Sequence, residues 1–359
     1  MKLLQKTISI TKKIASKNAI IDRLATPIID ATDSFLFRAG GISCGNTILR
    51  DWCDNKRYMF TVMIALFPIL FFSIYLFGWR MLSLVAVSYA VGVGIEAIFA
   101  AVRRHPINEG AFVTCLIYPL ILPPHIPLWM AAVGIAFGTI FAKEVFGGTG
   151  HNIFNPAMVG RVFLAISFSL AMTTGWVEPT LAWPGALHQY AVDTISSATP
   201  LSLFSRGHEL TNIVPLLIGN IGGSVGETSK LLIIPCGLFL LVTKVANWRT
   251  VLAIFVSVVI TSWIGNSLLP DRFAPTLFQL LSGGLLFGMF FMATDPVTST
   301  HTQTGKYFFG AIVGTLTVLI RAFTGYIEGF MFALLFANAF APLIDHIILK
   351  QKYGKDFIA

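Results

Sequence analysis

Charged residues are scarce in this chain. Asp, Glu, Lys and Arg make up only 12% of its 359 residues, whereas 55% are apolar and the mean hydropathy is +0.76. An average soluble domain carries about 25% charged residues, so the composition argues for a chain whose main solvent is lipid. The net charge of +8 does not indicate nucleic-acid binding. Ten of the 25 Lys and Arg precede Tyr58, and basic residues in such places mark the cytoplasmic flanks of membrane spans.

The chain also has few cysteines and lacks common enzyme motifs. Its four cysteines, Cys44, Cys53, Cys115 and Cys236, form no CxxC pair and no metal-ligand spacing, so we expect free thiols. No dinucleotide fingerprint follows a predicted strand, and no Ser/His/Asp or Cys/His arrangement is evident. Residues 2–57 are mixed and polar without a compact apolar core, which argues against a cleavable signal peptide.

Apolar segments fill most of the chain after residue 57. A helix that spans a bilayer needs roughly 20 apolar residues, and ten segments approach or reach this length. They lie at about 58–78, 80–101, 109–123, 127–142, 156–176, 228–246, 249–269, 276–293, 307–325 and 329–349. The apolar stretch 213–223 is too short to span and is a candidate for a re-entrant segment. The sequence therefore predicts an all-α polytopic membrane protein with about ten transmembrane helices, some of them short or broken.

Basic residues indicate how these spans are oriented. With both termini in the cytoplasm, the residues on the inner side include Arg103, Arg104, Lys143, Arg161, Lys244, Arg249 and Lys306. The loop 178–212, on the outer side, carries only Arg206. The predicted division is a cytoplasmic arm (1–57), a first membrane repeat (58–177), an extracytoplasmic loop (178–212), a second membrane repeat (213–349) and a cytoplasmic tail (350–359).

The division into repeats rests on a weak internal similarity. Gly134-Ile-Ala-Phe-Gly138 resembles Gly310-Ala-Ile-Val-Gly314, and Gly110-Ala-Phe-Val-Thr114 resembles Gly288-Met-Phe-Phe-Met-Ala-Thr294. Five spans separate the copies, an odd number, so the two repeats would be inverted. Inverted repeats with interrupted helices place a substrate or ion site near the midplane. The alternative is that these small residues serve ordinary helix packing.

Two polar stretches interrupt the apolar pattern. The first is Lys143-Glu-Val-Phe-Gly-Gly-Thr-Gly-His-Asn-Ile-Phe-Asn-Pro156, and the second is Met292-Ala-Thr-Asp-Pro-Val-Thr298. Irregular backbone at membrane depth is tolerated only where it is buried in protein or lines a cavity. The two stretches therefore predict a cofactor or ion site between broken helices.

The outer loop contains a possible modification signal. Asp193-Thr-Ile-Ser-Ser-Ala-Thr199 is, at its plainest, a Ser/Thr-rich turn that Pro200 ends. The spacing of Asp193, Ser196 and Thr199 is also similar to the signature at which a flavin transferase attaches FMN to threonine through a phosphoester bond. A covalent tether would remove the cost of holding a flavin from solution. The common form of the signature has Gly where this chain has Ser197.

Further motifs resemble one family of membrane redox subunits. They are Pro106-Ile-Asn-Glu-Gly-Ala-Phe-Val-Thr114, Leu122-Pro-Pro, Lys143-Glu-Val-Phe-Gly-Gly-Thr-Gly150, Asn155-Pro-Ala, Gly223-Ser-Val-Gly-Glu-Thr-Ser229, Met292-Ala-Thr-Asp-Pro-Val297 and Phe336-Ala-Asn-Ala-Phe-Ala-Pro-Leu-Ile-Asp345-His346. With the flavin signature they make the chain, from about Thr32 onward, similar to the B-type subunit of the sodium-translocating NADH:quinone oxidoreductase. The D-type subunit of the Rnf ferredoxin:NAD oxidoreductase belongs to the same family. The chain is shorter than typical members at the N-terminus and after the flavin loop.

The resemblance implies two flavins. One is FMN on Thr199, facing the outer side, and the other is non-covalent riboflavin within the subunit. The family uses flavins as one-electron relays between partner subunits toward a membrane quinone, with NADH bound by another subunit. Our hypothesis places riboflavin at Gly147, Gly148, Asn152 and Asn155, because an isoalloxazine needs amide-type donors and acceptors in an apolar slot. The rival interpretation is that the asparagines only cap a broken helix.

Acidic residues at the ends of spans are the cation candidates. Ionisable groups at such depths are costly and mostly functional, and hard cations favour carboxylate and carbonyl oxygens. The candidates for a sodium path are Glu109, Glu144, Asp295 and Asp345, of which the resemblance implies a role in sodium uptake for Glu109, Asp295 and Asp345. Asp295 precedes Pro296, which in a helix leaves a nearby carbonyl without its donor.

Some of these acids also have structural interpretations. Glu144 would pair with a neighbouring base, and Asp345 would simply lie in the cytoplasm beside Lys350. A further acid, Glu96, lies inside the second predicted span and is expected to bridge helices or to serve packing.

The composition and apolar runs predict a multi-pass membrane protein, and the resemblance implies that it is a redox subunit of an NADH:ubiquinone reductase in a bacterial inner membrane. It would relay electrons through FMN and riboflavin toward ubiquinone, coupled to Na⁺ translocation. The expected partners are the other subunits of the complex, ubiquinone, Na⁺, a flavin transferase and the lipid bilayer, with no nucleic acid. Two rivals stay open: the D-type subunit of an Rnf complex, and a flavin-free secondary carrier.

Overall fold

The computed structural model describes residues 12, 29, 55–103, 109–181, 183–191, 198–207, 210–324, 326 and 328–354. Every regular element within these ranges is a helix, so the predicted all-α fold is confirmed. The first half contains α3 (Asn55–Phe77), α4 (Arg80–Arg103), α5 (Gly110–Leu120), α6 (Leu128–Thr139), the π-helical η1 (Ile140–Glu144), α7 (Pro156–Ser167) and α8 (Ser169–Thr174). The second half contains α9 (Pro200–Gly207), α10 (Ile213–Ile218), α11 (Lys230–Val242), α12 (Trp248–Leu268), α13 (Thr276–Leu281), α14 (Leu285–Phe291), α15 (Gln303–Phe323) and α16 (Gly329–Tyr353). Nearly all of the predicted arm 1–57 lies outside the described residues.

Five of these helices are long and apolar enough to cross a membrane, namely α3, α4, α12, α15 and α16. The chain is therefore a multi-pass membrane protein. Shorter apolar helices occupy other predicted spans: α5, α7 and α11 have 11, 12 and 13 residues. At about 1.5 Å per residue, each is shorter than the roughly 30 Å hydrocarbon core. The count of ten spans stays a prediction.

Two predicted spans are interrupted. The segment 156–176 breaks at Phe168, between α7 and α8. The segment 276–293 breaks at Ser282, Gly283 and Gly284, between α13 and α14. Gly283 has a φ of +61°, a left-handed conformation that glycine adopts without strain. The span predicted to end at 142 instead continues through η1, and a π-helical turn of this kind often marks a functional site.

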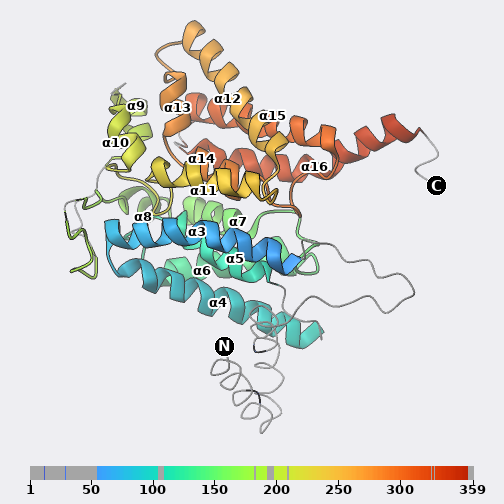
Figure 1. Cartoon of the computed structure of the whole chain (residues 1–359), viewed down its shortest axis with the longest axis horizontal. Coiled ribbons are helices and arrows are strands. Elements are labelled where there is room, and N and C mark those ends of the chain that lie inside the picture. Colours follow the sequence, from blue (N-terminus) through green and yellow to red (C-terminus); the bar gives the residue numbers. More distant parts are fainter. Residues whose placement is uncertain are drawn as a thin grey trace.

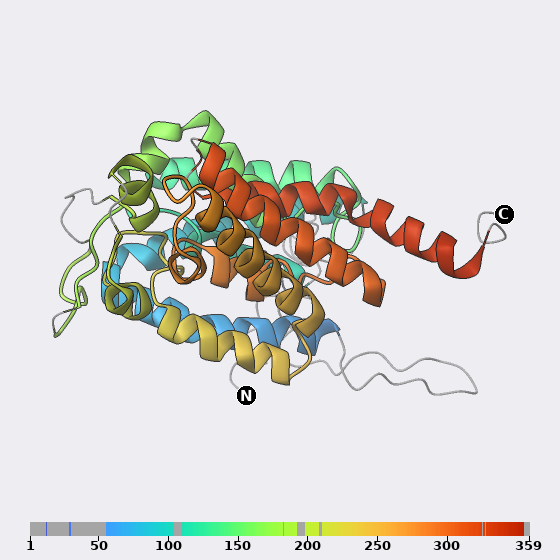
Figure 2. The same ribbon diagram turned by 90° about the horizontal axis from the view of Figure 1, so that it is seen from above.

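The two halves have parallel orders of neighbours. In the first half α6 contacts α4 and α7, and α5 contacts α3 and α7. In the second half α15 contacts α12 and α16, and α14 contacts α11 and α16. The halves join where α3 contacts α11 and α7 contacts α16, which Figures 1 and 2 show from two directions.

The two glycine motifs nevertheless face different partners. Gly138 of α6 approaches the backbone of α7 at Pro156 and Gly160, whereas Gly310 and Gly314 of α15 approach α12. Each motif therefore serves close helix packing, as the alternative interpretation held, but at contacts that are not equivalent in the two halves.

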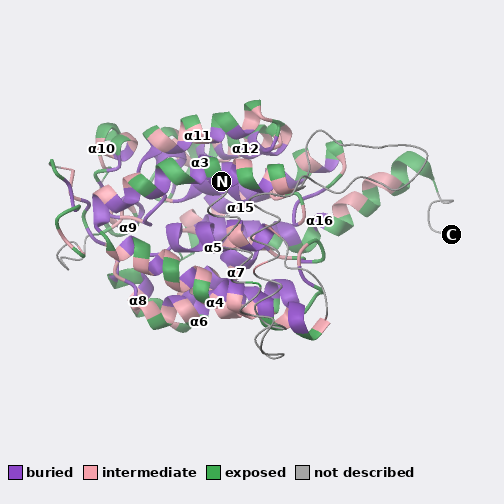
Figure 3. Ribbon diagram, turned by 60° about the horizontal axis from the view of Figure 1, so that its bottom comes forward, coloured by how far each residue is buried: buried purple, intermediate pink, exposed green. Residues whose placement is uncertain are grey.

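The inner helices are covered and the outer ones carry an apolar surface. All seven residues of α14 are buried, as are most residues of α5 and half of those of α7 (Figure 3). Large apolar side chains on outer helices are exposed, including Phe71, Ile98 and Trp263. Such a surface suits contact with lipid tails, which are as apolar as these side chains.

Candidate functional site

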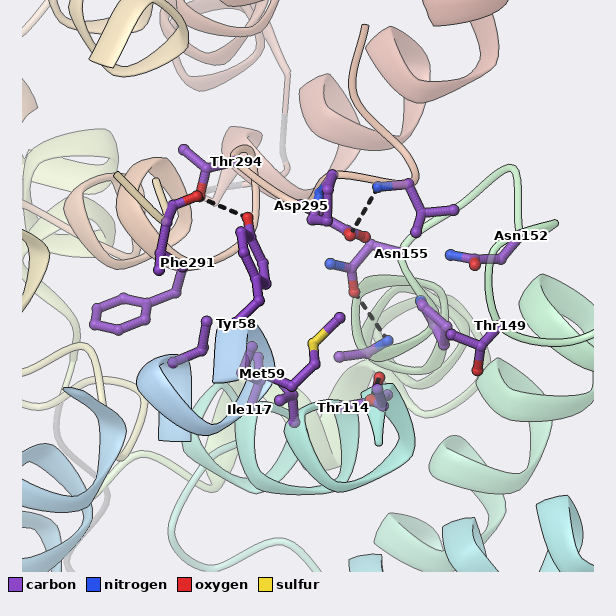
Figure 4. A pocket seen from close by; sticks show the side chains of 18 of the residues that line it. Tyr58, Met59, Thr114, Ile117, Thr149, Asn152, Asn155, Phe291, Thr294 and Asp295 are labelled. Atoms are coloured by element: carbon purple, nitrogen blue, oxygen red, sulfur yellow. Dashed lines mark hydrogen bonds between the residues drawn. The ribbon is translucent and has the colours of Figure 1, made fainter. Parts of the chain in front are cut away.

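A pocket opens where the N-termini of α3, α5 and α7 meet the C-terminal ends of α11 and α14 (Figure 4). We call it the polar pocket. It holds about 720 Å³ of space free of protein atoms, a figure that includes open solvent at its mouth. Its apolar wall includes Met59, Val62, Val113, Ile117, Leu240, Phe290 and Phe291. Its polar side chains include Thr114, Lys143, Thr149, Asn152, Asn155, Thr294 and Asp295.

The two polar stretches of the sequence meet in this pocket. Thr149, Asn152 and Asn155 come from the first stretch, and Thr294 and Asp295 from the second (Figure 4). They are far apart along the chain, yet they line one cavity. The two interruptions of the apolar pattern thus form a single feature of the fold.

Asn155 has a structural role in the pocket wall. Its Oδ1 accepts hydrogen bonds from Ala157 N (3.1 Å) and Met158 N (3.3 Å), so it is the N-cap of α7, with Pro156 at the first helical position. Asn152 shapes the preceding loop, because its Oδ1 accepts from the Gly150 amide at 3.3 Å. The capping interpretation therefore holds for Asn155. The cap does not use its Nδ2 group, which is left for a ligand.

Gly147 and Gly148 act on the backbone rather than in the pocket wall. Gly147 N donates to Glu144 O (3.1 Å) and Gly148 N donates to Lys143 O (3.0 Å), which ends η1. Their φ angles of +120° and +92° are left-handed, and this explains glycine at both positions. Of the four residues predicted to hold riboflavin, the two asparagines line the polar pocket and the two glycines turn the chain toward it.

Asp295 brings a carboxylate to the polar pocket. Its Oδ1 accepts from Val297 N (3.2 Å) and its Oδ2 from Thr298 Oγ1 (2.9 Å). The carbonyl that Pro296 was expected to leave without a donor is in fact paired, because Met292 O accepts from Asp295 N at 3.3 Å. The carboxylate is therefore the group of this segment that can attract a cation.

Lys143 also lines the pocket and belongs to a buried ion pair. Its Nζ is bonded to Glu96 Oε1 of α4, and the two side chains are 3% and 6% exposed. Glu96 thus bridges α4 and η1, as one interpretation of the sequence predicted. The positive-inside pattern counted Lys143 as a cytoplasmic flank; it is instead enclosed by protein.

Two other acidic candidates lie near the polar pocket. Glu144 is paired with Arg103, whose Nη1 lies 3.4 Å from Glu144 Oε2 and whose Nη2 donates to Glu144 O at 2.6 Å. The interpretation that Glu144 pairs with a neighbouring base is therefore confirmed. Glu109 precedes α5 and is adjacent to Gly110, which lines the polar pocket.

Asp345 of α16 anchors the loop before α15. Its carboxylate accepts from His301 N (2.7 Å), Thr302 N (3.0 Å) and Thr302 Oγ1 (2.5 Å). The same loop begins at Asp295. Asp345 does not line the polar pocket, and its contacts tie the position of that loop to α16.

Thr199 lies at the other end of the bundle, beside α9 at the left of Figure 1. Its Oγ1 accepts from Ser202 N at 3.3 Å, as an N-cap side chain does. It lines a cleft of about 310 Å³ free of protein atoms, which we call the threonine cleft. Gly222, Gly223, Glu227, Gly283 and Glu328 also line it. Asp193 and Ser196, the other residues of the predicted signature, lie outside the described residues.

A network of buried charges lies beside the threonine cleft. Arg161 of α7 is 2% exposed; its Nη1 donates to Glu227 Oε1 (2.8 Å) and its Nη2 to Ser224 Oγ (3.0 Å) and to Glu328 Oε2. Within the described part of the chain, Glu227 Oε2 has no hydrogen-bond partner. The positive-inside pattern counted Arg161 on the inner side of the membrane; its side chain does not flank a span in solvent but lies inside the bundle between two carboxylates.

Comparison with known proteins identifies the family. Residues 45–354 match the NQR2, RnfD, RnfE family. This chain belongs to that family. The B-type subunit of the Na(+)-translocating NADH-quinone reductase of Ectopseudomonas mendocina (strain ymp) is 38% identical over 379 residues, covering 90% of this chain and 91% of the relative. The corresponding subunits of Pseudomonas aeruginosa (strain LESB58) and Yersinia pestis are 38% and 35% identical, covering 90% of this chain and 91% and 92% of the relatives.

The family resemblance predicted from the motifs is thus confirmed. The matched range contains the polar pocket, Thr199 and the Arg161 network. Both hollows therefore belong to the region that the chain shares with its family.

Proposed function

We propose that this chain is the membrane redox subunit of a sodium-translocating NADH:quinone reductase in the bacterial inner membrane. It carries FMN covalently on Thr199 and riboflavin without a covalent bond, and it relays electrons toward ubiquinone while Na⁺ crosses. One observation about this member of the family carries the proposal. Thr199 lines the threonine cleft, both polar breaks line the polar pocket, and the short helix α7 lies between the two hollows. The names of the relatives support the sodium and NADH–quinone parts.

The surroundings of Thr199 suit a phosphoester. Its hydroxyl lies at the N-terminus of the eight-residue helix α9, where Ser202 N already donates to it. Backbone amides and the helix dipole at such an end stabilise a negative charge. A bond between Thr199 Oγ1 and the FMN phosphate would place the phosphate charge beside these amides. The side chain is partly exposed, so a transferase could reach it.

The threonine cleft fits a flat polar ring. Gly222 and Gly223 leave room for a ring to approach the backbone, since they carry no side chain. The unpartnered Glu227 Oε2 is an acceptor for an N–H group such as that of an isoalloxazine. The bound flavin would supply one-electron chemistry. The chain's own contribution is to hold and orient it.

The polar pocket fits the second flavin by the chemistry of its donors. Aromatic side chains of Phe290 and Phe291 provide apolar walls, and Asn155 provides an amide whose direction is fixed by its capping bonds. A few well-placed polar groups within apolar walls are typical of cofactor sites. We therefore place riboflavin here, beside Asn152 and Asn155.

Helix α7 links the walls of the two hollows. Asn155 caps its start in the polar pocket, and Arg161, six residues later, is bonded to Glu227 of the threonine cleft. Six residues of α-helix rise about 9 Å. One short helix and its side chains therefore connect the two hollows, which favours electron transfer between groups bound in them.

We place the cation path at the polar-pocket end. Asp295 offers a carboxylate there, and Glu109 lies next to the pocket wall. Asp345 contributes indirectly by fixing the loop that begins at Asp295, and Glu144, already paired with Arg103, is the weaker candidate.

The parallel neighbour orders support ten spans in two inverted repeats, with α4, α6 and α7 matching α12, α15 and α16. With both termini cytoplasmic, the polar pocket then opens inward and the threonine cleft outward. The other subunits of the complex would bring electrons in and pass them on.

The first test is in-gel flavin fluorescence of the denatured chain, expressed in its native host, beside Thr199→Ala. A fluorescent band that disappears in the variant is expected. A dark band in the unmodified protein, despite an active transferase, would refute the FMN assignment and favour a flavin-free carrier. Acid-released riboflavin from the same preparation should be near one per chain and should not change in Thr199→Ala.

The cation path has its own test. Sodium-stimulated turnover of the whole complex should be lost or shifted to higher Na⁺ concentration in Asp295→Asn and in Glu109→Gln. Normal sodium dependence in both variants would remove these residues from the path.

The family description also includes RnfD, so a D-type subunit of an Rnf complex is the second candidate. The subunits that co-purify with the chain distinguish the two complexes.

A further inference from the structure

Lys143 and Asp295 share the wall of the polar pocket. Lys143 is bonded to Glu96 Oε1 of α4, and this pair is almost completely buried. The charge of Lys143 also acts on the carboxyl of Asp295. One buried ammonium group thus has two acids within its electrostatic reach.

The hydrogen bonds show which acid holds the ammonium. Lys143 Nζ is bonded to Glu96, whereas Asp295 accepts only from neutral donors, Val297 N and Thr298 Oγ1. Among the described residues, no cationic side chain is within ion-pair distance of Asp295. The Asp295 carboxylate therefore lines the pocket without an ion-pair partner among the described residues.

The other charged groups nearby do not change this balance. Glu144 adjoins Lys143 in sequence, but Arg103 is paired with it. Glu96 and Lys143 neutralise each other, and so do Arg103 and Glu144. Of the charged side chains Glu96, Lys143, Arg103, Glu144 and Asp295, that of Asp295 has no ion-pair partner among the described residues.

We propose that Glu96 is a positioning residue for the cation path: by holding Lys143, it keeps Asp295 open to the transported monovalent cation. The inference rests on the proposed placement of that path at Asp295. A lysine ammonium and a sodium ion carry the same charge and compete for the same carboxylate. If Glu96 did not hold it, Lys143 would act as a tethered cation that occupies the site at high local concentration.

The expected effect follows from this competition. The apparent affinity of Asp295 for Na⁺ is its intrinsic affinity multiplied by the fraction of time during which Lys143 does not occupy Asp295. If released Lys143 occupies Asp295 for about nine-tenths of the time, the half-saturating Na⁺ concentration rises about tenfold. Turnover at saturating Na⁺ is restored, because the ion displaces the lysine.

The test uses the whole complex with three variants: Glu96→Gln, Glu96→Asp, and the double variant Glu96→Gln/Lys143→Met. Turnover is measured against Na⁺ concentration, together with the midpoint of the Na⁺-dependent rise in melting temperature, which reports ion binding without turnover. Glu96→Gln should raise the half-saturating Na⁺ concentration about tenfold in both assays. Glu96→Asp keeps the charge and should stay within about threefold of the unmodified protein, and so should the double variant, because it lacks the competing ammonium.

Two results would overturn the proposal. One is a Glu96→Gln variant with unchanged Na⁺ dependence. The other is a double variant that is as impaired as Glu96→Gln, which would mean that the ion pair only supports the fold. If Glu96→Gln does not fold, the comparison of Glu96→Asp with the double variant decides. Asp295→Asn, assayed in parallel, distinguishes failure of the cation path from failure of the role of Glu96. Normal sodium dependence in Asp295→Asn refutes the cation path itself. Loss of sodium dependence in Asp295→Asn, together with normal sodium dependence in Glu96→Gln, refutes only the role of Glu96.

Discussion

Removing Arg161 should destabilise the protein strongly. In Arg161→Met, Glu227 and Glu328 lose the guanidinium that lies between them, and their side chains are only 4% and 16% exposed. Taking one partner from a buried ion pair costs about 3–5 kcal/mol, because an uncompensated charge stays in a medium of low dielectric constant. The variant also loses the bond to Ser224, so α7 loses its polar ties to the segment before α11 and to α16.

The corresponding change in melting temperature can be worked out from the chain length. An unfolding entropy of about 2.1 cal/mol/K per residue, over 359 residues, converts 3–5 kcal/mol into a fall in Tm of roughly 4–7 °C. The assay is thermal unfolding of the purified protein in detergent. Arg206→Met is the matched control, since Arg206 is exposed and a surface change of this kind shifts stability by less than about 0.5 kcal/mol.

A rescue variant separates charge from packing. Arg161→Met/Glu328→Gln removes one charge of each sign and keeps the Glu227 carboxylate, whose charge also acts on the buried Lys230 and on Arg321. Replacement of a whole buried ion pair by neutral groups is often nearly neutral. We expect this double variant to recover most of the lost Tm. The reasoning is refuted if Arg161→Met melts at the same temperature as the unmodified protein, or if the double variant is no more stable than the single one.

Three further predictions concern the packing and the polar pocket. Gly160→Ala should lower the free energy of unfolding by about 1–3 kcal/mol, because the added Cβ would lie 2.6 Å from Gly134 O. Gly94→Ala is the control: the position has open space around it, so the change should be tolerated in the same thermal assay. Asn155→Ala should lose about 1 kcal/mol of stability from the missing N-cap, and it should also lose acid-released riboflavin. Asn155→Ser should keep the cap and lose only the riboflavin. Equal riboflavin content in the unmodified protein and both variants would contradict a role for the amide. Asp345→Asn should cost about 1.5–3 kcal/mol through weaker bonds to His301 and Thr302, and it should raise the Na⁺ concentration needed for half-maximal turnover; an unchanged value would show that the loop at Asp295 does not depend on it.

The features that could be predicted from the sequence are those with a local signal. The polar breaks at Asn155 and Asp295 were evident because lipid gives irregular backbone no partner, and the structure brings both to one pocket. Helix boundaries followed from the apolar runs, since length and hydropathy decide membrane helices. The break at Gly283 was missed because apolar residues on both sides made 276–293 resemble one uninterrupted span.

The pairings of buried charges could not be predicted in the same way. Arg161 meets Glu227 and Glu328, which lie 66 and 167 residues later in the chain. Lys143 likewise meets Glu96, 47 residues earlier. In the sequence alone, Arg161 and Lys143 each fit the positive-inside rule. Only the packing of α4, α7 and α16 shows that the partner of each cation is an acid inside the bundle.

The shortness of α7 has an electrical consequence. A membrane voltage falls across the layer that excludes water, and carrying one elementary charge through 100 mV is worth about 2.3 kcal/mol. In the orientation proposed above, the polar pocket and the threonine cleft enter the bundle from opposite sides, and Asn155 and Arg161 are separated by about 9 Å of rise along α7. The layer between the hollows would then be thinner than the roughly 30 Å hydrocarbon core, and the electric field across it would be steeper. A charge that passes along these two turns of helix would cross most of the voltage in one short step.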